Sequence, residues 1–331
     1  MRIGVLGAGA VGGVLAALLD RAGHEVVVTA RGEHADALRQ NGLRLAGGWG
    51  ESEHRLRVVG RLDAPLDLIV LATKAHDSAA ALAAAEGLDG VPVFVVQNGL
   101  GGADAVRDAL PHSPVAIGLA LFAVSLTAPG VVEVTGPAPL AIGGDAAAVA
   151  VALPLMRDAL PADVTEVTDV HGAQWTKLLV NQVNALPAIT GLSVQQVVAN
   201  DALRGILTES MRETARVGRA ADVRWQTIGA MGAAQVRALL AGDGVAADAV
   251  PQALVAGMGS VPNPASTLQS IRRGRSTEID ALNGAVVAEG RRVGVPTPVN
   301  AALVALVHEV EHTGTFLAVD AAVAQVGPTG G

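Results

Sequence analysis

The first half of the chain alternates between short apolar segments and segments with helical periodicity. Unbroken apolar segments bounded by Gly or polar residues are typical of buried parallel strands. Four of them lie at residues 2–6, 25–29, 67–72 and 93–96. The turn-rich sequence that follows predicts antiparallel additions to the same sheet at 131–135 and 140–142, then a helix over 149–160 and a strand over 164–167. Pro154 argues against the first turn of that helix. The pattern as a whole predicts an α/β domain.

From residue 169 onward the apolar positions recur with the period of an α-helix. We expect helices at 174–185, 203–221, 278–293 and 299–312. A loop region with weak helical pieces is expected over 240–264, and a frayed tail ends at Gly331. Ser276 or Thr277 is expected to cap the third helix, with Glu278 in its first turn. The change of period predicts two domains, an α/β domain over 1–168 and an all-α domain over 169–331.

A glycine-rich turn follows the first predicted strand and opens the first predicted helix. In this GxGxxG pattern Gly7 permits a tight turn, Gly9 lets a pyrophosphate approach the backbone, and Gly12 lets helix and strand pack closely. The N–H groups and dipole of the helix N-terminus favour phosphate. A structural glycine turn is the alternative. We predict a Rossmann-type dinucleotide-binding domain whose cofactor contacts include Gly7, Ala8, Gly9, Ala10, Val11 and Gly12.

The residue at the end of the second strand indicates which dinucleotide is bound. NAD sites usually place an acidic residue there, whereas this chain has Arg31, which can hold a 2′-phosphate with two hydrogen bonds. This favours NADP, although the acidic Glu33 lies close by. The alternative is that Arg31 is a solvated loop residue. Lys74 and Asn98 follow the third and fourth strands, and ligands bind at the carboxyl ends of such strands. We expect both near cofactor or substrate; a surface lysine and a turn asparagine are the alternatives.

Three polar residues share one face of the otherwise apolar helix predicted over 174–185. Lys177, Asn181 and Asn184 lie at i, i+4 and i+7, and Pro187 is expected to weaken or kink the helix beyond them. Burying an ammonium and two amides without partners would cost several kcal/mol. The three side chains therefore either meet internal partners or face a cleft that receives a polar ligand. The nucleotide-binding domain that precedes this helix favours the cleft.

Charge and composition exclude several classes of function. The 331 residues contain 23 Lys and Arg against 31 Asp and Glu, and this net charge of -8 disfavours binding to nucleic acids and anionic membranes. No apolar run of about 18 residues predicts a transmembrane helix. A strand that starts at Arg2 argues against a signal peptide, so we expect a cytoplasmic protein. Cys and Tyr are absent, which excludes thiol and tyrosine chemistry.

We expect no metal site. The eight histidines form no HExxH motif, and His308 and His312, four residues apart on the last predicted helix, are typical of a solvated face.

The motifs together resemble the ketopantoate reductase (2-dehydropantoate 2-reductase) family from residue 1 to about 312. The resemblance implies NADPH-dependent reduction of ketopantoate to D-pantoate, a step towards pantothenate and coenzyme A. It implies that Lys177 is the general acid and Glu278 its catalytic partner, and it places Asn98, Asn181, Asn184 and Ser266 in the substrate site. It is carried by the glycine turn, Arg31, Thr73-Lys74-Ala75, Asn98-Gly99-Leu100-Gly101, Trp175 to Asn181, Ser266 to Gln269 and Arg275 to Asp280.

Three departures from the family pattern leave the exact 2-keto acid open. Ser270 stands where an acidic residue is usual, Phe122 where a histidine is common, and Asn181 and Asn184 are three rather than four residues apart. A reductase of another 2-oxo acid on the same architecture, or a non-catalytic NADP-binding sensor, is the alternative function. We expect a small-molecule 2-keto acid as partner, and whether the chain forms a homodimer stays open.

Overall fold

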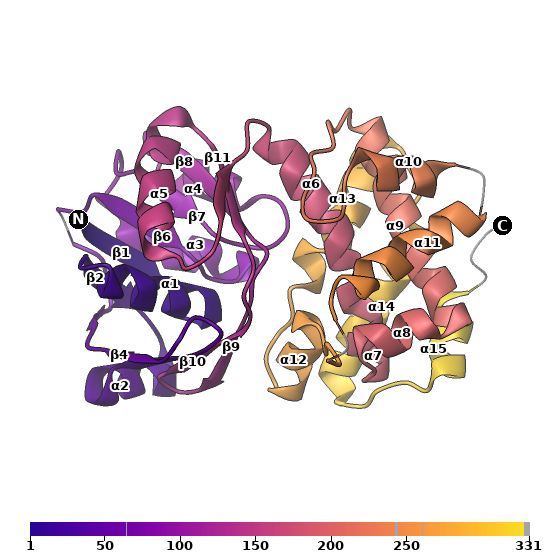
Figure 1. Ribbon diagram of the computed structural model, residues 1–331, viewed down its shortest axis with the longest axis horizontal. Coiled ribbons are helices and arrows are strands. Elements are labelled where there is room, and N and C mark those ends of the chain that lie inside the picture. Colours follow the sequence, from indigo (N-terminus) through magenta and orange to yellow (C-terminus); the bar gives the residue numbers. More distant parts are fainter. Residues whose placement is uncertain (64, 242–243, 260, 328–331) are drawn as a thin grey trace. The chain divides into compact units, whose positions relative to one another are not determined.

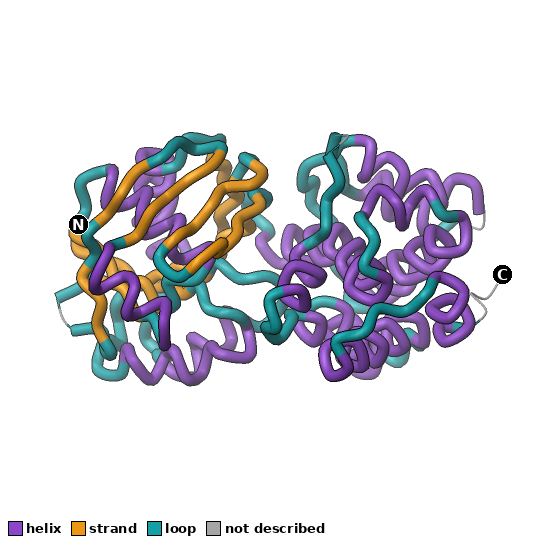
Figure 2. Tube along the Cα trace, turned by 90° about the horizontal axis from the view of Figure 1, so that it is seen from below, coloured by secondary structure: helices purple, strands orange, loops and turns teal. Residues whose placement is uncertain are grey.

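The computed structural model describes residues 1–63, 65–241, 244–259 and 261–327 (Figure 1). The chain divides into two compact units, Met1–Val170 and His171–Gly331. All the named strands lie in the first unit, and the described part of the second is helical (Figure 2). The expected fold class, α/β followed by all-α, is confirmed. The four parallel strands that the sequence predicts at 2–6, 25–29, 67–72 and 93–96 are present in the first unit.

The main sheet of the first unit has eight strands in the order β12-β11-β8-β7-β6-β1-β2-β5. Neighbouring strands run parallel except β11 and β8, which are antiparallel, so the prediction for 140–142 is confirmed. The central strands are almost wholly buried because helices cover both faces of such a sheet. The strands are Arg2–Leu6 (β1), Glu25–Thr29 (β2), Arg57–Val59 (β5), Leu68–Leu71 (β6), Val93–Val95 (β7), Val115–Ala120 (β8), Leu140–Gly144 (β11) and Val164–Glu166 (β12).

A second sheet corrects the prediction for residues 131–135. Val131–Gly136 (β10) does not join the main sheet but pairs in parallel with Leu43–Gly47 (β3), in a four-stranded sheet of order β4-β3-β10-β9. Along β10, Val132 and Val134 are buried, whereas Val131 and Glu133 are only partly buried. This alternation belongs to a sheet with one covered face. The other two strands are Ser52–His54 (β4) and Ala123–Ala128 (β9).

The helices of the first unit differ from expectation in one place. Ala146–Ala159 (α5) starts three residues before the predicted residue 149 and contains Pro154 in its interior. The proline removes the hydrogen bond to the carbonyl of Ala150, but both residues are exposed, so water can satisfy that carbonyl. The other helices are Ala10–Arg21 (α1), Gly32–Asn41 (α2), Ser78–Leu82 (α3) and Gly102–Ala109 (α4), with 3₁₀ turns at Ala75–Asp77 (η1) and Ala83–Ala85 (η2).

The second unit is a helical bundle around the twenty-residue helix Asp201–Ala220 (α9), which packs against several of the others (Figure 1). Its core contains apolar side chains from most of these helices. The remaining helices are Val170–Asn181 (α6), Ala185–Thr190 (α7), Val194–Ala199 (α8), Ala233–Leu240 (α10), Gly244–Ala256 (α11), Ser266–Arg272 (α12), Asn283–Val293 (α13), Pro298–Thr313 (α14) and Val319–Val326 (α15), with 3₁₀ turns at Gln182–Asn184 (η3) and Ile279–Ala281 (η4).

Three helix predictions for this unit are wrong in detail. The helix expected through residue 185 stops at Asn181, and η3 intervenes before α7. This restart puts Pro187 in the first turn of α7, where its missing N–H has no intrahelical partner to lose. Helix α11 is a continuous helix where only weak helical pieces within a loop region were expected, because it packs on α9 and α10. The helix expected from residue 278 begins only at Asn283.

Within the described residues, no helix combines the length and the hydrophobicity needed to span a bilayer. The predicted frayed tail lies outside the described residues from 328 onward.

Candidate active site

The three motif glycines meet different surroundings in the structure. Gly7 has φ +90°, and a Cβ there would lie 2.5 Å from Thr73 Cγ2. A Cβ at Gly12 would overlap the carbonyl oxygen of Gly7, so the fold itself requires glycine at both positions. A Cβ at Gly9, in contrast, would meet no atom of the described residues within 4 Å. Because the chain leaves the space at Gly9 open, this glycine fits a backbone that a ligand approaches closely.

Hydrogen bonds to Thr29 in β2 hold the glycine turn. Among the described residues, no side chain caps the N-terminal end of α1. The Gly7 and Ala8 N–H groups donate to the hydroxyl and the carbonyl of Thr29, at 3.0 and 2.9 Å. Gly9 is the N-cap of α1 and has no side chain with which to accept from the first-turn N–H groups of that helix. Such a helix end suits a pyrophosphate, so the residues present fit a dinucleotide.

Arg31 follows β2 as the N-cap residue of α2 and has a mostly exposed side chain, whose Nη2 lies 3.0 Å from the Asp77 carboxylate in η1. Lys74 is the N-cap residue of η1, and Asn98 follows β7; both are half-buried. Arg31 and the segment that starts at Lys74 therefore follow β2 and β6, the two strands that flank β1 in the main sheet. The sequence did not predict that the Asp77 carboxylate forms an ion pair with the Arg31 guanidinium.

Gln97 is a residue of this region that the sequence reading missed. Its Nε2 donates to the Thr73 carbonyl at 2.8 Å and to the Ser78 hydroxyl at 2.9 Å, which ties the end of β7 to the segment after β6. Its Oε1 is buried and has no hydrogen-bond partner among the described residues. The signal in the sequence was its position, directly before Asn98 at the end of a buried strand.

In the second unit, α6 carries Lys177 into the interior, where its side chain is 7% exposed. Burial disfavours the charged ammonium and lowers the pKa of Lys177 to about 8, against the opposing effect of the Glu278 carboxylate. The Glu278 carboxylate thus contributes a favourable charge to the Lys177 ammonium. A lysine with this pKa is still mostly protonated at pH 7 and can donate a proton.

Asn181, Asn184 and Ser266 form a second group in this unit. The Asn184 Oδ1 accepts from the backbone N–H and the hydroxyl of Ser266, each at 3.1 Å. The Asn184 Nδ2 donates to the carbonyl of Asn181 at 2.9 Å. The Asn181 Nδ2 is buried and has no hydrogen-bond partner among the described residues. An amide donor left unsatisfied in this way is costly unless a ligand accepts from it.

One expectation about local placement is wrong. Glu278 is not in the first turn of α13 but precedes the 3₁₀ turn η4, so helix-start chemistry does not account for it. Phe122 is 6% exposed and packs edge-on against Trp49 with ring centroids 4.9 Å apart. It is part of the core of the first unit.

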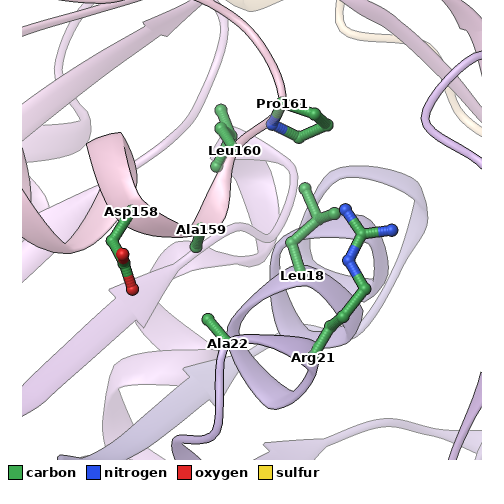
Figure 3. Close-up of a pocket in the computed structure, with 7 residues that line it drawn as sticks. All are labelled: Leu18, Arg21, Ala22, Asp158, Ala159, Leu160 and Pro161. Carbon is green, nitrogen blue, oxygen red and sulfur yellow. The ribbon is translucent and has the colours of Figure 1, made fainter.

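A depression of about 260 Å³ lies in the first unit, between the C-terminal end of α1 and that of α5 (Figure 3). It is remote from the glycine turn, because the intervening turns of α1 span about 15 Å at 1.5 Å per residue. It is lined by Leu18, Arg21, Ala22, Asp158, Ala159, Leu160 and Pro161. We therefore assign it no part in the chemistry. The described residues also contain no group of three or more His, Asp or Glu side chains placed to hold a metal ion.

A dinucleotide-binding fold, followed in the chain by a helical unit that buries a lysine near a carboxylate, defines a nicotinamide-dependent oxidoreductase as the class. Residues 3–146 match the model "Ketopantoate reductase PanE/ApbA", and residues 169–311 match the model of its C-terminal domain. The chain belongs to the ketopantoate reductase family, an enzyme family of NADP-dependent oxidoreductases of the 2-dehydropantoate 2-reductase type.

Several named proteins are similar to this chain over nearly its whole length. A 2-dehydropantoate 2-reductase of Mesorhizobium japonicum is 30% identical over 94% of this chain and 98% of its own. One of Pyrococcus horikoshii is 29% identical over 95% and 99%. A ketopantoate reductase structure from Ralstonia eutropha superposes with a TM-score of 0.78 at 29% identity, covering 94% and 99%. D-Mandelate dehydrogenase with NADH and anilino(oxo)acetate shares the fold, with a TM-score of 0.80 at 24% identity over 95% and 99%.

Proposed function

We propose that this chain reduces the 2-keto group of ketopantoate to D-pantoate with NADPH, a step towards pantothenate and coenzyme A. The observation that carries the proposal is the buried Lys177, whose pKa is lowered to about 8 by burial against the opposing charge of Glu278. The names of the relatives support the keto acid, and the glycine turn and Arg31 support the cofactor.

The roles of the second unit's residues follow from the charge that the reaction creates. When bound, the nicotinamide supplies a hydride to the 2-keto carbon. Negative charge then develops on the carbonyl oxygen, where the Lys177 ammonium donates a hydrogen bond and then a proton. Its burial strengthens this interaction, because little water competes for the oxygen. Glu278 favours the ammonium form and so keeps Lys177 ready to donate.

The amide and hydroxyl groups suit a substrate with a carboxylate and a hydroxyl. The unsatisfied Asn181 Nδ2 is a donor for a substrate oxygen. Ser266 binds substrate through its hydroxyl, and Asn184 holds Ser266 by accepting two hydrogen bonds from it. Asn98, at a strand end of the first unit, supplies a further amide. In this assignment Asn184 acts on the substrate through Ser266.

Turnover with different acids tests the proposal. NADPH oxidation is followed by absorbance with ketopantoate, ketoisovalerate, pyruvate and phenylglyoxylate, the last because a D-mandelate dehydrogenase shares the fold. We expect the highest kcat/KM with ketopantoate. Higher kcat/KM with another acid would replace the named substrate. No turnover with any of the four would favour an NADP-binding sensor.

The pH dependence of the reduction reports on Lys177. Because the protonated amine is the active form, kcat/KM is expected to be flat below about pH 8 and to fall tenfold per pH unit above it. Initial rates between pH 6 and 10 give this profile. Glu278→Gln removes the charge that raises the pKa of Lys177, so the fall should begin at a lower pH. A profile of Glu278→Gln identical to that of the unmodified enzyme would argue against the pairing.

The preference for NADPH over NADH is expected to depend on Arg31 and Asp77. A charge-assisted contact to the 2′-phosphate is worth about 1.5–3 kcal/mol, so Arg31→Ala should weaken 2′,5′-ADP at least tenfold and leave 5′-AMP unchanged. Asp77→Asn removes the carboxylate that competes for Arg31 and should tighten 2′,5′-ADP a few-fold. Calorimetric titration measures both. Arg39→Ala is the matched control, since Arg39 makes a similar exposed ion pair with Asp36. Equal losses for both nucleotides would contradict the assignment.

A further inference from the structure

Helix α14 contacts the segment that carries Glu278 at two points. The Glu311 Oε1 accepts from the backbone N–H of Thr277 at 2.6 Å. One turn earlier on the helix, His308 Nε2 lies 3.0 Å from the Asp280 carboxylate in η4, and His308 Nδ1 lies 2.7 Å from Glu311 Oε2. His308 thus links two carboxylates, one on its own helix and one on the segment of Glu278. The sequence predicts a solvated helix face for this histidine.

The residues that these contacts hold lie on both sides of Glu278 in the sequence. Thr277 precedes it and is held by Glu311, and Asp280 follows two residues later and is held by His308. Between them Ile279 is fully buried and its N–H donates to the Thr277 hydroxyl at 3.3 Å. Thr277 and Asp280, on either side of Glu278, are therefore attached to α14, and Ile279 is attached to the core. The Glu278 carbonyl accepts from the N–H groups of Ala281 and Leu282 at 2.9 and 3.1 Å, so the segment itself forms a single helical turn.

We propose that His308 and Glu311 are positioning residues that hold the Glu278 carboxylate at the distance from Lys177 that the proton transfer needs. The inference rests on the function proposed above for Lys177 and Glu278. His308 and Glu311 touch neither reacting atom; they act through the backbone of Thr277 and through Asp280.

The charges of the group support this role. Desolvation opposes the charged form of His308, but hydrogen bonds to Asp280 and Glu311 outweigh it and raise the pKa of the imidazole above its usual value. The pKa of Glu311 is lowered, despite desolvation, by its hydrogen bonds with Thr277 and His308. At neutral pH a protonated His308 can donate from both ring nitrogens, one to each carboxylate. Neutral imidazole has a single N–H and can hold only one of them.

A purely structural role makes a different prediction. The side chains of His308 and Asp280 are 44% and 75% exposed, and exposed ion pairs add little to stability. If the contacts are only exposed surface interactions, their removal should change neither kcat nor the ionisation of Lys177. If they position Glu278, their removal should lower kcat and move the alkaline fall of kcat/KM to lower pH, because the ammonium loses its counter-charge.

The test compares His308→Ala and His308→Gln with His312→Gln. His312 lies one turn further along the same helix, is exposed, and serves as the matched control. For His308→Ala we expect kcat to fall about tenfold, as small misplacements of catalytic groups do, with the KM for NADPH unchanged. We also expect the alkaline fall to shift by about half a pH unit, with His308→Gln in between because its amide keeps one donor. His312→Gln should match the unmodified enzyme.

Glu311→Gln gives a second, independent variant. Its amide oxygen can still accept from Thr277 N–H, but the charge that stabilises protonated His308 is gone. It should therefore reproduce the shift of His308→Gln with a smaller loss of kcat. Thermal unfolding of each variant shows whether it is folded. An unchanged pH profile in folded His308→Ala, together with an inactive Lys177→Ala, would overturn the positioning role alone. An active Lys177→Ala would overturn the proposed function itself.

Discussion

Replacing Lys177 by alanine is expected to lower kcat by about 10²–10⁴-fold, the usual contribution of a positioned general acid. The KM for the keto acid should change far less, because Asn181 and Ser266 supply the proposed substrate contacts. Steady-state rates with saturating NADPH and single-turnover absorbance changes separate the chemical step from binding. Turnover near that of the unmodified enzyme would refute the assignment.

Lys177→Met is the companion variant, because it fills the space of the buried side chain without its charge. Below pH 8 the folded protein holds a buried ammonium whose pKa is lowered from 10.5 to about 8. This difference corresponds to an unfavourable contribution of roughly 3 kcal/mol to folding. The methionine variant should therefore unfold at a higher temperature than the unmodified protein at pH 7, while being equally inactive.

The sign of the pH dependence supplies a check on this explanation. Between pH 8 and 10.5 the unfolded chain binds more protons at this lysine than the folded chain, so the stability of the unmodified protein rises with pH. The advantage of Lys177→Met should shrink across the same window in denaturant titrations. An advantage that stays constant up to pH 10.5 would mean that desolvation of the charge is not its cause.

The second large effect is expected from the glycine turn, where Gly9→Ala and Gly12→Ala should fail in different ways. A methyl group at residue 12 meets the Gly7 carbonyl and lies 3.1 Å from the Ala72 Cβ, so it should cost at least about 1–3 kcal/mol of stability. At residue 9 the methyl group meets no atom within 4 Å in the part of the chain that the structure describes. Gly9→Ala should keep its unfolding temperature but bind NADPH at least tenfold more weakly, because a pyrophosphate needs that space.

Gly60→Ala is the control for both variants, since it lies in the same unit, has no neighbour within 4 Å of the added Cβ and has no positive φ. Thermal unfolding and NADPH titration by fluorescence give the two readouts. Gly9→Ala with unaltered NADPH affinity would show that the glycine is there for another reason. Gly12→Ala with unaltered stability would show that the turn can rearrange.

The sequence predicted the elements whose signals are local. The strand at 2–6 and the glycine turn were evident because apolar runs and Gly7, Gly9 and Gly12 carry their own conformational requirements. It did not predict that 131–136 belongs to a second sheet, since the choice of partner strand depends on residues 43–47, far away in the sequence. Helix α11 was predicted only as weak helical pieces for a similar reason: its stability comes from packing on α9 rather than from its own residues.

The candidate site shows the same division between local and distant information. The spacing of Lys177, Asn181 and Asn184 indicated a polar face, but the 3₁₀ turn after Asn181 aims Asn184 at Ser266, which lies 82 residues further along the chain. No pattern in the sequence links these two residues. The same holds for His308 and Glu278, whose connection runs through hydrogen bonds to Thr277 and Asp280.

The hydrogen bonds between Asn184 and Ser266 have a consequence for how this enzyme can diverge. Substitution of either residue leaves the other with a buried or misdirected polar group, so their effects are not independent. A lineage that changes its keto acid through Ser266 must cross an intermediate in which Asn184 has lost its partner. The fold thus makes the two positions epistatic, and successful changes of substrate are expected to alter both together.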